Sequence, residues 1–210
     1  HARHESQGRS IAITVNTTET ARAVNREIQW QGHRRTGVGI DLHDDTTAYV
    51  GDRIATRRNH PDLRSDTGER VRNRQTWTVT DIAKDGTITA RHDQRGTVTL
   101  PADYVAEHVE LGWAVTGYGN QGDTVDVGIA VLEASCSRKH AYVAMTRGRH
   151  ANHAILVDPS GTADPAEQLA EIIARPMSAE SALAVQERLH REAGFDPPEP
   201  VESSLRPSDH

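Results

Sequence analysis

The sequence predicts an α/β domain that is interrupted by a small β-barrel and followed by C-terminal helices. Apolar, β-branched runs at 11–15, 125–132 and 153–157 have the length and composition of buried strands in a parallel sheet. Helical periodicity follows the first run, as the β-then-α order of an α/β layer requires. Residues 53–100 instead alternate short strand-like runs with turn dipeptides, which is typical of antiparallel hairpins.

A helix is expected directly after the strand at 11–15. Thr17 or Thr18 can cap its first turn, because a threonine hydroxyl accepts from a free backbone N–H there. Apolar residues then recur at helical spacing up to Ile28, and Gly37 ends the pattern. The result is a strand and a helix joined by a short connection.

The middle of the chain predicts a small barrel, either SH3-like or OB-like. Residues 41–48 are polar and are expected to form a loop. Turns are expected at Asp85-Gly86 and near Arg95-Gly96, and Pro101 ends the barrel. The strands expected between these points are 53–56, 77–80, 88–91 and 97–100.

A second α/β stretch follows the barrel. A strand ends near Thr116, and Ser137 can cap a helix that runs to about Gly148. Two amphipathic helices, 165–174 and 178–193, precede a proline-rich acidic tail that predicts disorder. The domains are therefore expected at 1–48 and 105–160 (the α/β domain), 49–104 (the barrel), 161–195 (helices) and 196–210 (the tail).

The formal net charge of −6 is unevenly distributed. Residues 158–210 contain 11 acidic residues and 4 arginines, so the preceding part of the chain is nearly neutral. Because a polyanion responds to local charge, the total does not exclude nucleic acid as a partner. The single cysteine, Cys136, excludes an intrachain disulfide and a cysteine-rich zinc site. The apolar runs are too short to span a membrane, so we expect a cytoplasmic protein.

Several catalytic motifs are absent from the sequence. It contains no phosphate-binding G-x-x-x-x-G-K-[ST] loop, no G-x-S-x-G turn and no H-E-x-x-H motif. Its twelve histidines form no complete ligand set, so we expect no metal site; His108 and Glu110 are expected to share one face of a strand. Cys136 with His140 could form a nucleophile and base, but a buried thiol is the favoured interpretation.

Residues 116–124 form a glycine-rich polar segment after a strand. Such a segment at the carboxyl end of a strand is where α/β sheets often contact phosphates, although a tight polar turn is equally compatible with the spacing. Arg147 and Arg149 lie at the end of the next predicted helix. They can neutralise the helix dipole or act as an anion clamp, and the pattern alone leaves both open.

The barrel contributes a basic loop. Residues 52–74 contain seven arginines and four acidic residues, which suits single-stranded nucleic acid. Trp77 could stack on a base, but its place in an alternating strand favours the barrel core. The candidate phosphate contacts are Arg57, Arg58, Arg72 and Arg74.

These features in this order resemble the C-terminal motor region of superfamily 1 DNA helicases of the RecD-like group. They are most similar to TrwC/TraI-type conjugative relaxase-helicases of actinobacteria, in which an SH3-like barrel (domain 2B) interrupts the second RecA-like domain (2A). The matching stretches are Gly51–Ile54 and Leu100–Val105 at the barrel ends, His108–Thr116 on the return into 2A, Thr116–Thr124 (motif V), Tyr142–Arg149 (motif VI) and, more weakly, 11–28 with Asn25 (motif IV).

The resemblance implies roles for these residues. Arg147 resembles the arginine finger that reaches the γ-phosphate of ATP, with Thr146 orienting it and Arg149 assisting. The residues implied in nucleotide coupling are Gln121, Gly122, Asp123 and Thr124, and those implied in contacts with single-stranded DNA are Thr116, Tyr118 and Asn120. ATP and Mg²⁺ would be bound mainly by a P-loop domain, 1A, that the sequence does not contain.

The sequence departs from the family pattern at two positions. Tyr118 replaces the usual histidine of motif V, and Gly119 replaces its basic residue. We therefore keep two hypotheses. The chain is the C-terminal half of a helicase motor whose partners are single-stranded DNA, domain 1A and a relaxase domain, or it is a stand-alone, degenerate module that binds nucleic acid or a partner without hydrolysing ATP.

Overall fold

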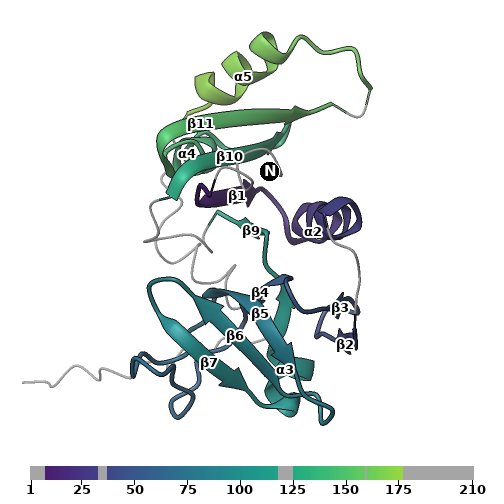
Figure 1. The fold of residues 1–210 in the computed structure, drawn as a ribbon. Coiled ribbons are helices and arrows are strands. Elements are labelled where there is room, and N and C mark those ends of the chain that lie inside the picture. The colour runs from purple at the N-terminus through teal and green to yellow at the C-terminus, as the bar shows by residue number, and fades with distance from the viewer. Residues whose placement is uncertain (1–7, 33–36, 118–124, 159, 177–210) are drawn as a thin grey trace, which may run out of the picture. The chain divides into compact units, whose positions relative to one another are not determined.

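A four-stranded parallel sheet forms one part of the molecule (Figure 1). The computed structural model describes residues 8–32, 37–117, 125–158 and 160–176. The strand order is β11-β10-β1-β9, and each neighbouring pair is parallel. The strands are β1 (Ile11–Val15), β9 (Ala114–Thr116), β10 (Val125–Glu133) and β11 (Gly148–Val157).

Helices pack on both faces of this sheet. Successive residues of β10 point to opposite faces, so Val131 joins one apolar cluster with Ala21 while Leu132 joins another with Ile172. The first cluster places α2 on one face, and the second places α4 and α5 on the other. The helices are α2 (Thr18–Gly32), α4 (Arg138–Ala144) and α5 (Pro165–Ala174).

Side-chain caps explain where these helices begin. The Thr20 backbone N–H donates to Thr17 Oγ1 at 3.1 Å, and Ser137 Oγ accepts from a backbone N–H in the first turn of α4. Asp164 caps α5 in the same way, and Pro165 provides a first residue that needs no N–H partner. The expected strand at 11–15 and helix at 165–174 have the bounds that the sequence predicted.

A five-stranded antiparallel sheet, in the order β7-β6-β5-β4-β8, lies between α2 and β9 along the chain. Its core is built around the buried side chains of Trp77, Tyr104 and Trp113. Among the described residues, the hydrogen-bond ladder does not close from β7 to β8. The elements are β4 (Arg53–Thr56), β5 (Thr76–Ile82), β6 (Ile88–His92), β7 (Gly96–Leu100), α3 (Ala102–His108) and β8 (Val109–Leu111).

Several local expectations were wrong. The segment 41–48 is not only a loop, because β2 (Ile40–Asp41) pairs with β3 (Thr47–Ala48). His108 and Glu110 do not share a strand, because His108 ends α3 whereas Glu110 lies on β8. The helix after Ser137 ends earlier than expected, since pairing with β10 starts β11 at Gly148.

The predicted helix at 178–193 and the predicted tail lie outside the described residues. No helix in the described part of the chain is long and apolar enough to cross a membrane.

Candidate nucleotide and nucleic-acid site

The end of α4 holds Arg147 and Thr146 against their own helical turn. Arg147 Nε donates to the Val143 carbonyl at 2.8 Å, and the hydroxyl of Thr146 donates to the Tyr142 carbonyl at 2.9 Å. The Arg147 carbonyl accepts from the Val125 backbone N–H at 3.1 Å, which ties this turn to the beginning of β10. The half-buried Arg147 side chain is therefore held in one direction at the amino-terminal edge of the sheet.

Gly148 and Asn152 shape the chain immediately after Arg147. A Cβ on Gly148 would lie 2.0 Å from the Ala151 carbonyl oxygen, so no larger residue fits. Asn152 accepts from the Gly148 N–H at 2.8 Å and donates to its carbonyl at 2.9 Å. The sequence reasoning missed both residues; the only signal was a glycine between two arginines.

Thr116 lies at the opposite end of the parallel strands, where they terminate at their carboxyl ends. It is in register with Val15, which is in turn level with Val131, whereas Gly148 is level with Val125. Six strand residues separate these levels, about 20 Å at 3.3 Å per residue. The structure therefore does not bring Thr116 and Arg147 together along the sheet.

Most of the predicted motif V cannot be placed. Tyr118, Asn120, Gln121, Gly122, Asp123 and Thr124 lie outside the described residues. Gly117, the last described residue of the segment, approaches His140 so closely that an added Cβ would lie 2.7 Å from the ring carbon Cε1. This contact places the start of the segment beside the first turns of α4.

The arginines predicted to bind phosphate lie in one long connection, residues 57–75, called here the basic loop. The hydroxyl of Thr56 donates to the Arg72 carbonyl at 2.6 Å, and the Thr56 carbonyl accepts from the Arg74 N–H at 2.5 Å. Both ends of the loop are therefore adjacent in space. The structure brings the backbones of Arg57 and Arg58 next to those of Arg72 and Arg74.

The four arginine side chains differ in their contacts. The Arg57 guanidinium forms an ion pair with Glu110 at 3.2 Å, and Arg58 donates to Nε2 of His108 at 3.2 Å. Arg72 is exposed, whereas Arg74 is half-buried with φ of 70°. Arg72 therefore fits a phosphate contact better than Arg57, whose charge is already paired.

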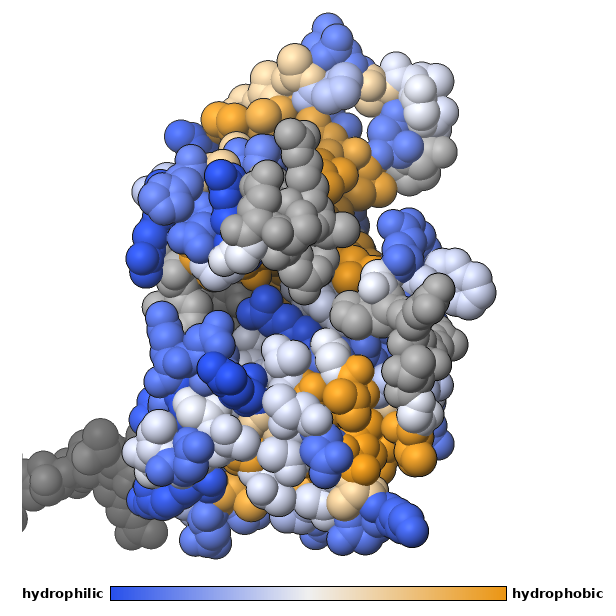
Figure 2. All heavy atoms as spheres, in the orientation of Figure 1, coloured by the Kyte–Doolittle hydropathy of each residue, from blue (hydrophilic) through white to orange (hydrophobic). Residues whose placement is uncertain are grey.

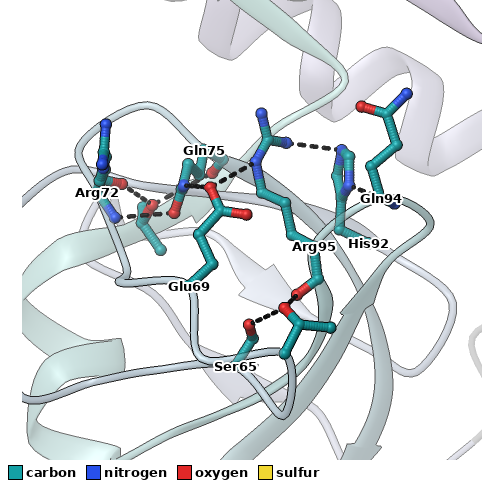
Figure 3. Close-up of polar contacts among 9 residues, drawn as sticks. Ser65, Glu69, Arg72, Gln75, His92, Gln94 and Arg95 are labelled. Carbon is teal, nitrogen blue, oxygen red and sulfur yellow. Dashed lines mark hydrogen bonds and ion pairs between the residues drawn. The ribbon is translucent and has the colours of Figure 1, made fainter.

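Acidic and amide side chains hold the basic loop onto the β6–β7 hairpin (Figure 3). Glu69 accepts from Gln75 at 3.2 Å and pairs with Arg95 Nε at 3.5 Å. Arg95 also donates to His92 Nε2 at 2.8 Å. Asp66 accepts from the Thr97 backbone N–H at 2.8 Å. Two of the three acidic residues of the loop are thus engaged in holding it.

The outward side of the basic loop is consequently positive. Four of its arginines, Arg58, Arg64, Arg70 and Arg72, are exposed. In the view of Figure 2, hydrophilic side chains cover much of the antiparallel region, and apolar side chains cover a smaller part of it. A preformed positive surface of this kind can contact the phosphates of a nucleic acid with little ordering cost.

Trp77 does not belong to this surface. Its side chain is 2% exposed, and its indole Nε1 is buried without a hydrogen-bond partner among the described residues. The ring makes an edge contact with His92 at 6.0 Å between centroids. The core interpretation of Trp77 is confirmed.

Cys136 has the environment of a core residue. It is fully buried among apolar residues, and burial raises the pKa of its thiol to about 11. A nucleophilic cysteine needs the opposite shift, so the structure favours the buried-thiol interpretation. In the described part of the chain, no three His, Cys, Asp or Glu side chains are grouped so that they could hold a metal ion.

Comparisons with known proteins identify the fold. The Pif1 helicase from Bacteroides in complex with ADP-AlF3 and single-stranded DNA matches 88% of this chain with a TM-score of 0.52 and 20% sequence identity. Bacteroides Pif1 bound to single-stranded DNA matches the same share with a TM-score of 0.50 and 17% identity. The chain therefore shares the fold of the matched half of these Pif1 helicases. The predicted α/β class with a RecA-like parallel sheet is confirmed.

The chain spans about half the length of the proteins it matches, 46% of each of these two Pif1 chains. Uncharacterised proteins from two strains of Mycobacterium tuberculosis are 37% identical over 90 residues, which is 42% of this chain and 52% of theirs. No family model matches the sequence.

Proposed function

We propose that this chain is the second RecA-like domain of an ATP-dependent DNA helicase, with an SH3-like barrel inserted at about residues 49–104. The observation that supports this most strongly is a fold match over 88% of the chain to one half of a helicase. The motif order supports a RecD-like motor of the TrwC type, which would belong to a conjugative relaxase-helicase. In this proposal the other half of the ATP site is supplied by a P-loop domain.

Arg147 is the proposed arginine finger. Its Nε bond to Val143 holds the side chain before any nucleotide arrives, and a preorganised guanidinium can stabilise charge on a transferring phosphoryl group. Thr146 holds the same helical turn, and Arg149 adds positive charge one residue beyond Gly148. ATP and Mg²⁺ would be bound mainly by the P-loop domain, and residues 121–124 would couple that site to DNA.

Single-stranded DNA is the proposed partner of the basic loop. The exposed Arg58 and Arg72 would contact phosphates, together with Arg74, whereas Arg57 would contribute mainly through its pair with Glu110. Thr116, Tyr118 and Asn120 would contact the DNA at the parallel sheet. The alternative is a stand-alone module that binds nucleic acid without ATP chemistry; Tyr118 and Gly119, where the family has polar or basic residues, favour it.

Two measurements test this proposal. Titration of labelled single-stranded DNA at several salt concentrations should give an affinity that falls steeply with salt, and absence of binding at low ionic strength would contradict the DNA role. With the P-loop domain supplied in the same polypeptide, DNA should stimulate ATP hydrolysis. DNA binding without any stimulated hydrolysis in that polypeptide would favour the stand-alone module.

A further inference from the structure

The chain enters the antiparallel sheet through one connection and leaves it through another, and both are hydrogen-bonded to one face of α2. The first crossing, on the way in, is the connection from β3 (which pairs with β2 in a separate two-stranded sheet) to β4, and the second, on the way out to the parallel sheet, is the connection from β8 to β9. Asn25 and Gln29 lie one helical turn apart on α2 and therefore point in the same direction. Both are nearly fully buried, with exposed fractions of 3% and 5%.

Asn25 fastens the second crossing. Its Nδ2 donates to the Leu111 carbonyl at 2.8 Å and to the Ala114 carbonyl at 3.1 Å, and its Oδ1 accepts from the Ala114 N–H at 2.6 Å. The three bonds span the last residue of β8 and the first residue of β9. Between them, Gly112 passes so close to β4 that a Cβ would lie 2.5 Å from the Ile54 carbonyl carbon.

Gln29 fastens the first crossing. Its Nε2 donates to the Thr47 carbonyl at 2.8 Å and to Asp52 Oδ2 at 2.5 Å. The same carboxylate oxygen accepts from the Tyr49 N–H at 2.9 Å. Asp52 is 1% exposed, and its Oδ1 has no partner among the described residues, so Gln29 supplies a large share of the hydrogen bonding of a buried carboxylate.

These contacts are directional hydrogen bonds, and this property determines how far the two sheets can move relative to each other. Apolar packing between two sheets is non-directional and tolerates sliding. Buried amides bonded to backbone carbonyls do not, because any displacement leaves buried polar atoms unsatisfied. A third directional contact joins the sheets at another point, where Arg53 of β4 donates to the Ile11 carbonyl of β1 at 3.1 Å.

We propose that Asn25 and Gln29 are positioning residues that make the parallel and antiparallel sheets move as one body. The consequence rests on the proposed helicase function: DNA held by the basic loop is displaced together with the parallel sheet when that sheet closes on a nucleotide. The rigid connection between the two sheets, called here the joint, is a property of the chain itself, and it can be tested without ATP or DNA.

The distance between two spin labels, one in the antiparallel region and one in the parallel-sheet region, measures directly how rigidly the two regions are connected. Cysteines introduced by Lys84→Cys, in the β5–β6 turn, and Glu171→Cys, on α5, carry the labels, while buried Cys136 stays unlabelled under native conditions. The parent chain should give one narrow distance distribution, and Gln29→Glu should broaden it, because its carboxylate repels Asp52. An unchanged width in Gln29→Glu, with the chain folded, would overturn the proposal.

A double variant with the pair reversed and a matched control variant distinguish a loss of the rigid connection between the sheets from a general loss of stability. In the double variant Q29E/D52N the donor and the acceptor of the pair between positions 29 and 52 exchange places, while the Thr47 carbonyl loses its donor. The distribution should therefore be narrower than in Gln29→Glu but broader than in the parent, and a distribution as broad as that of Gln29→Glu counts against the proposal. Gln168 is a buried glutamine whose Nε2 donates to the Val157 carbonyl at 3.2 Å, within the parallel-sheet region. Gln168→Met should therefore lower stability without broadening the distribution.

The consequence for function has its own readout. In the polypeptide that contains the P-loop domain, Gln29→Glu should reduce DNA stimulation of ATP hydrolysis by about 2- to 30-fold, the range expected of a residue that couples two sites. DNA affinity should change little, because the basic loop is intact. If the parent neither binds DNA nor hydrolyses ATP, the proposed function fails while the spin-label result still decides the joint.

Discussion

The two sheets of this protein differ in the aromatic side chains that they bury. The buried clusters on the parallel sheet consist of Ile, Val, Leu, Ala and Cys, whereas the core of the antiparallel sheet contains Trp77, Tyr104 and Trp113 in addition to Ile, Val, Leu and Ala. Parallel strands with helices on both faces need compact, β-branched residues so that three layers can approach. The core of the antiparallel sheet contains three of the eight aromatic residues of the chain.

The polar residues of the two regions are also held differently. Arg147 is held by the last turn of its own helix, and its backbone carbonyl is bonded to the start of β10. The basic loop is held by a network that joins Glu69, Gln75, Arg95 and His92 from separate segments. Substitutions in the network under the basic loop should therefore lower the stability of the fold as well as change the loop.

The largest effect is expected from Arg147→Ala. In the polypeptide with an added P-loop domain, DNA-stimulated ATP hydrolysis should fall by about 10³-fold or more if Arg147 is the proposed arginine finger, because arginine fingers contribute about 10³ to 10⁵ to phosphoryl transfer. Steady-state hydrolysis and thermal unfolding are measured together. Arg138→Ala, at the exposed start of α4, is the control; equal rates for both variants would remove the arginine-finger role.

Trp77→Ala should be the most destabilising substitution in the antiparallel core. Removing a fully buried indole costs about 3–5 kcal/mol of unfolding free energy, measured by urea denaturation. Trp77→Phe should cost far less, because the indole N–H has no hydrogen-bond partner to lose among the described residues. Equal losses for the two variants would indicate that the N–H is satisfied.

The reactivity of the Cys136 thiol measures how well the core on the parallel sheet is buried. With its pKa raised by burial to about 11 from an ordinary value of 9.0, the thiolate fraction near neutral pH falls by about 100-fold. Alkylation by iodoacetamide should be slower than in the urea-unfolded chain by at least this factor. A native rate close to the unfolded rate would contradict the buried position.

Arg72→Ala should weaken DNA binding modestly. Loss of one phosphate contact is expected to reduce the slope of log affinity against log salt by about 0.7 for single-stranded DNA. Arg91→Ala is the control, since Arg91 is an exposed arginine of β6 outside the basic loop. Identical slopes for Arg72→Ala and the parent would place the DNA elsewhere.

The smallest effect concerns Glu110. Burial raises the pKa of this carboxyl above its ordinary value of 4.5, and the nearby Arg57 only partly offsets it. The folded state therefore binds the Glu110 proton more tightly than the unfolded state does. This contribution to stability is present below pH 4.5 and is lost as the pH rises through 4.5 to the raised folded value.

Glu110→Gln should accordingly remove part of the fall in stability between pH 4 and 7. Urea unfolding at several pH values measures this difference against the parent. A variant that loses stability more steeply than the parent as pH rises would show that the pair with Arg57 outweighs burial.

The sequence predicted elements whose signals are local. The strand at Ile11–Val15 is a compact β-branched run, and the α5 boundaries follow from Asp164 and Pro165 at its start. It could not predict the β2–β3 pairing or the early start of β11, because both depend on partners distant in the sequence. The roles of Gly148 and Asn152 were missed for the same reason.

Two observations came from the sequence alone: the α/β class, through its hydrophobic periodicity, and the absence of a G-x-x-x-x-G-K-[ST] motif from these 210 residues. The tertiary structure decided which charges are engaged. Arg57 and Arg72 look equivalent in the sequence, yet one pairs with Glu110 and the other is exposed. It also placed Asn25 and Gln29 against carbonyls that lie 18 to 89 residues away. A side-chain amide reads as polar in a sequence, and only the folded chain shows which backbone groups it must satisfy.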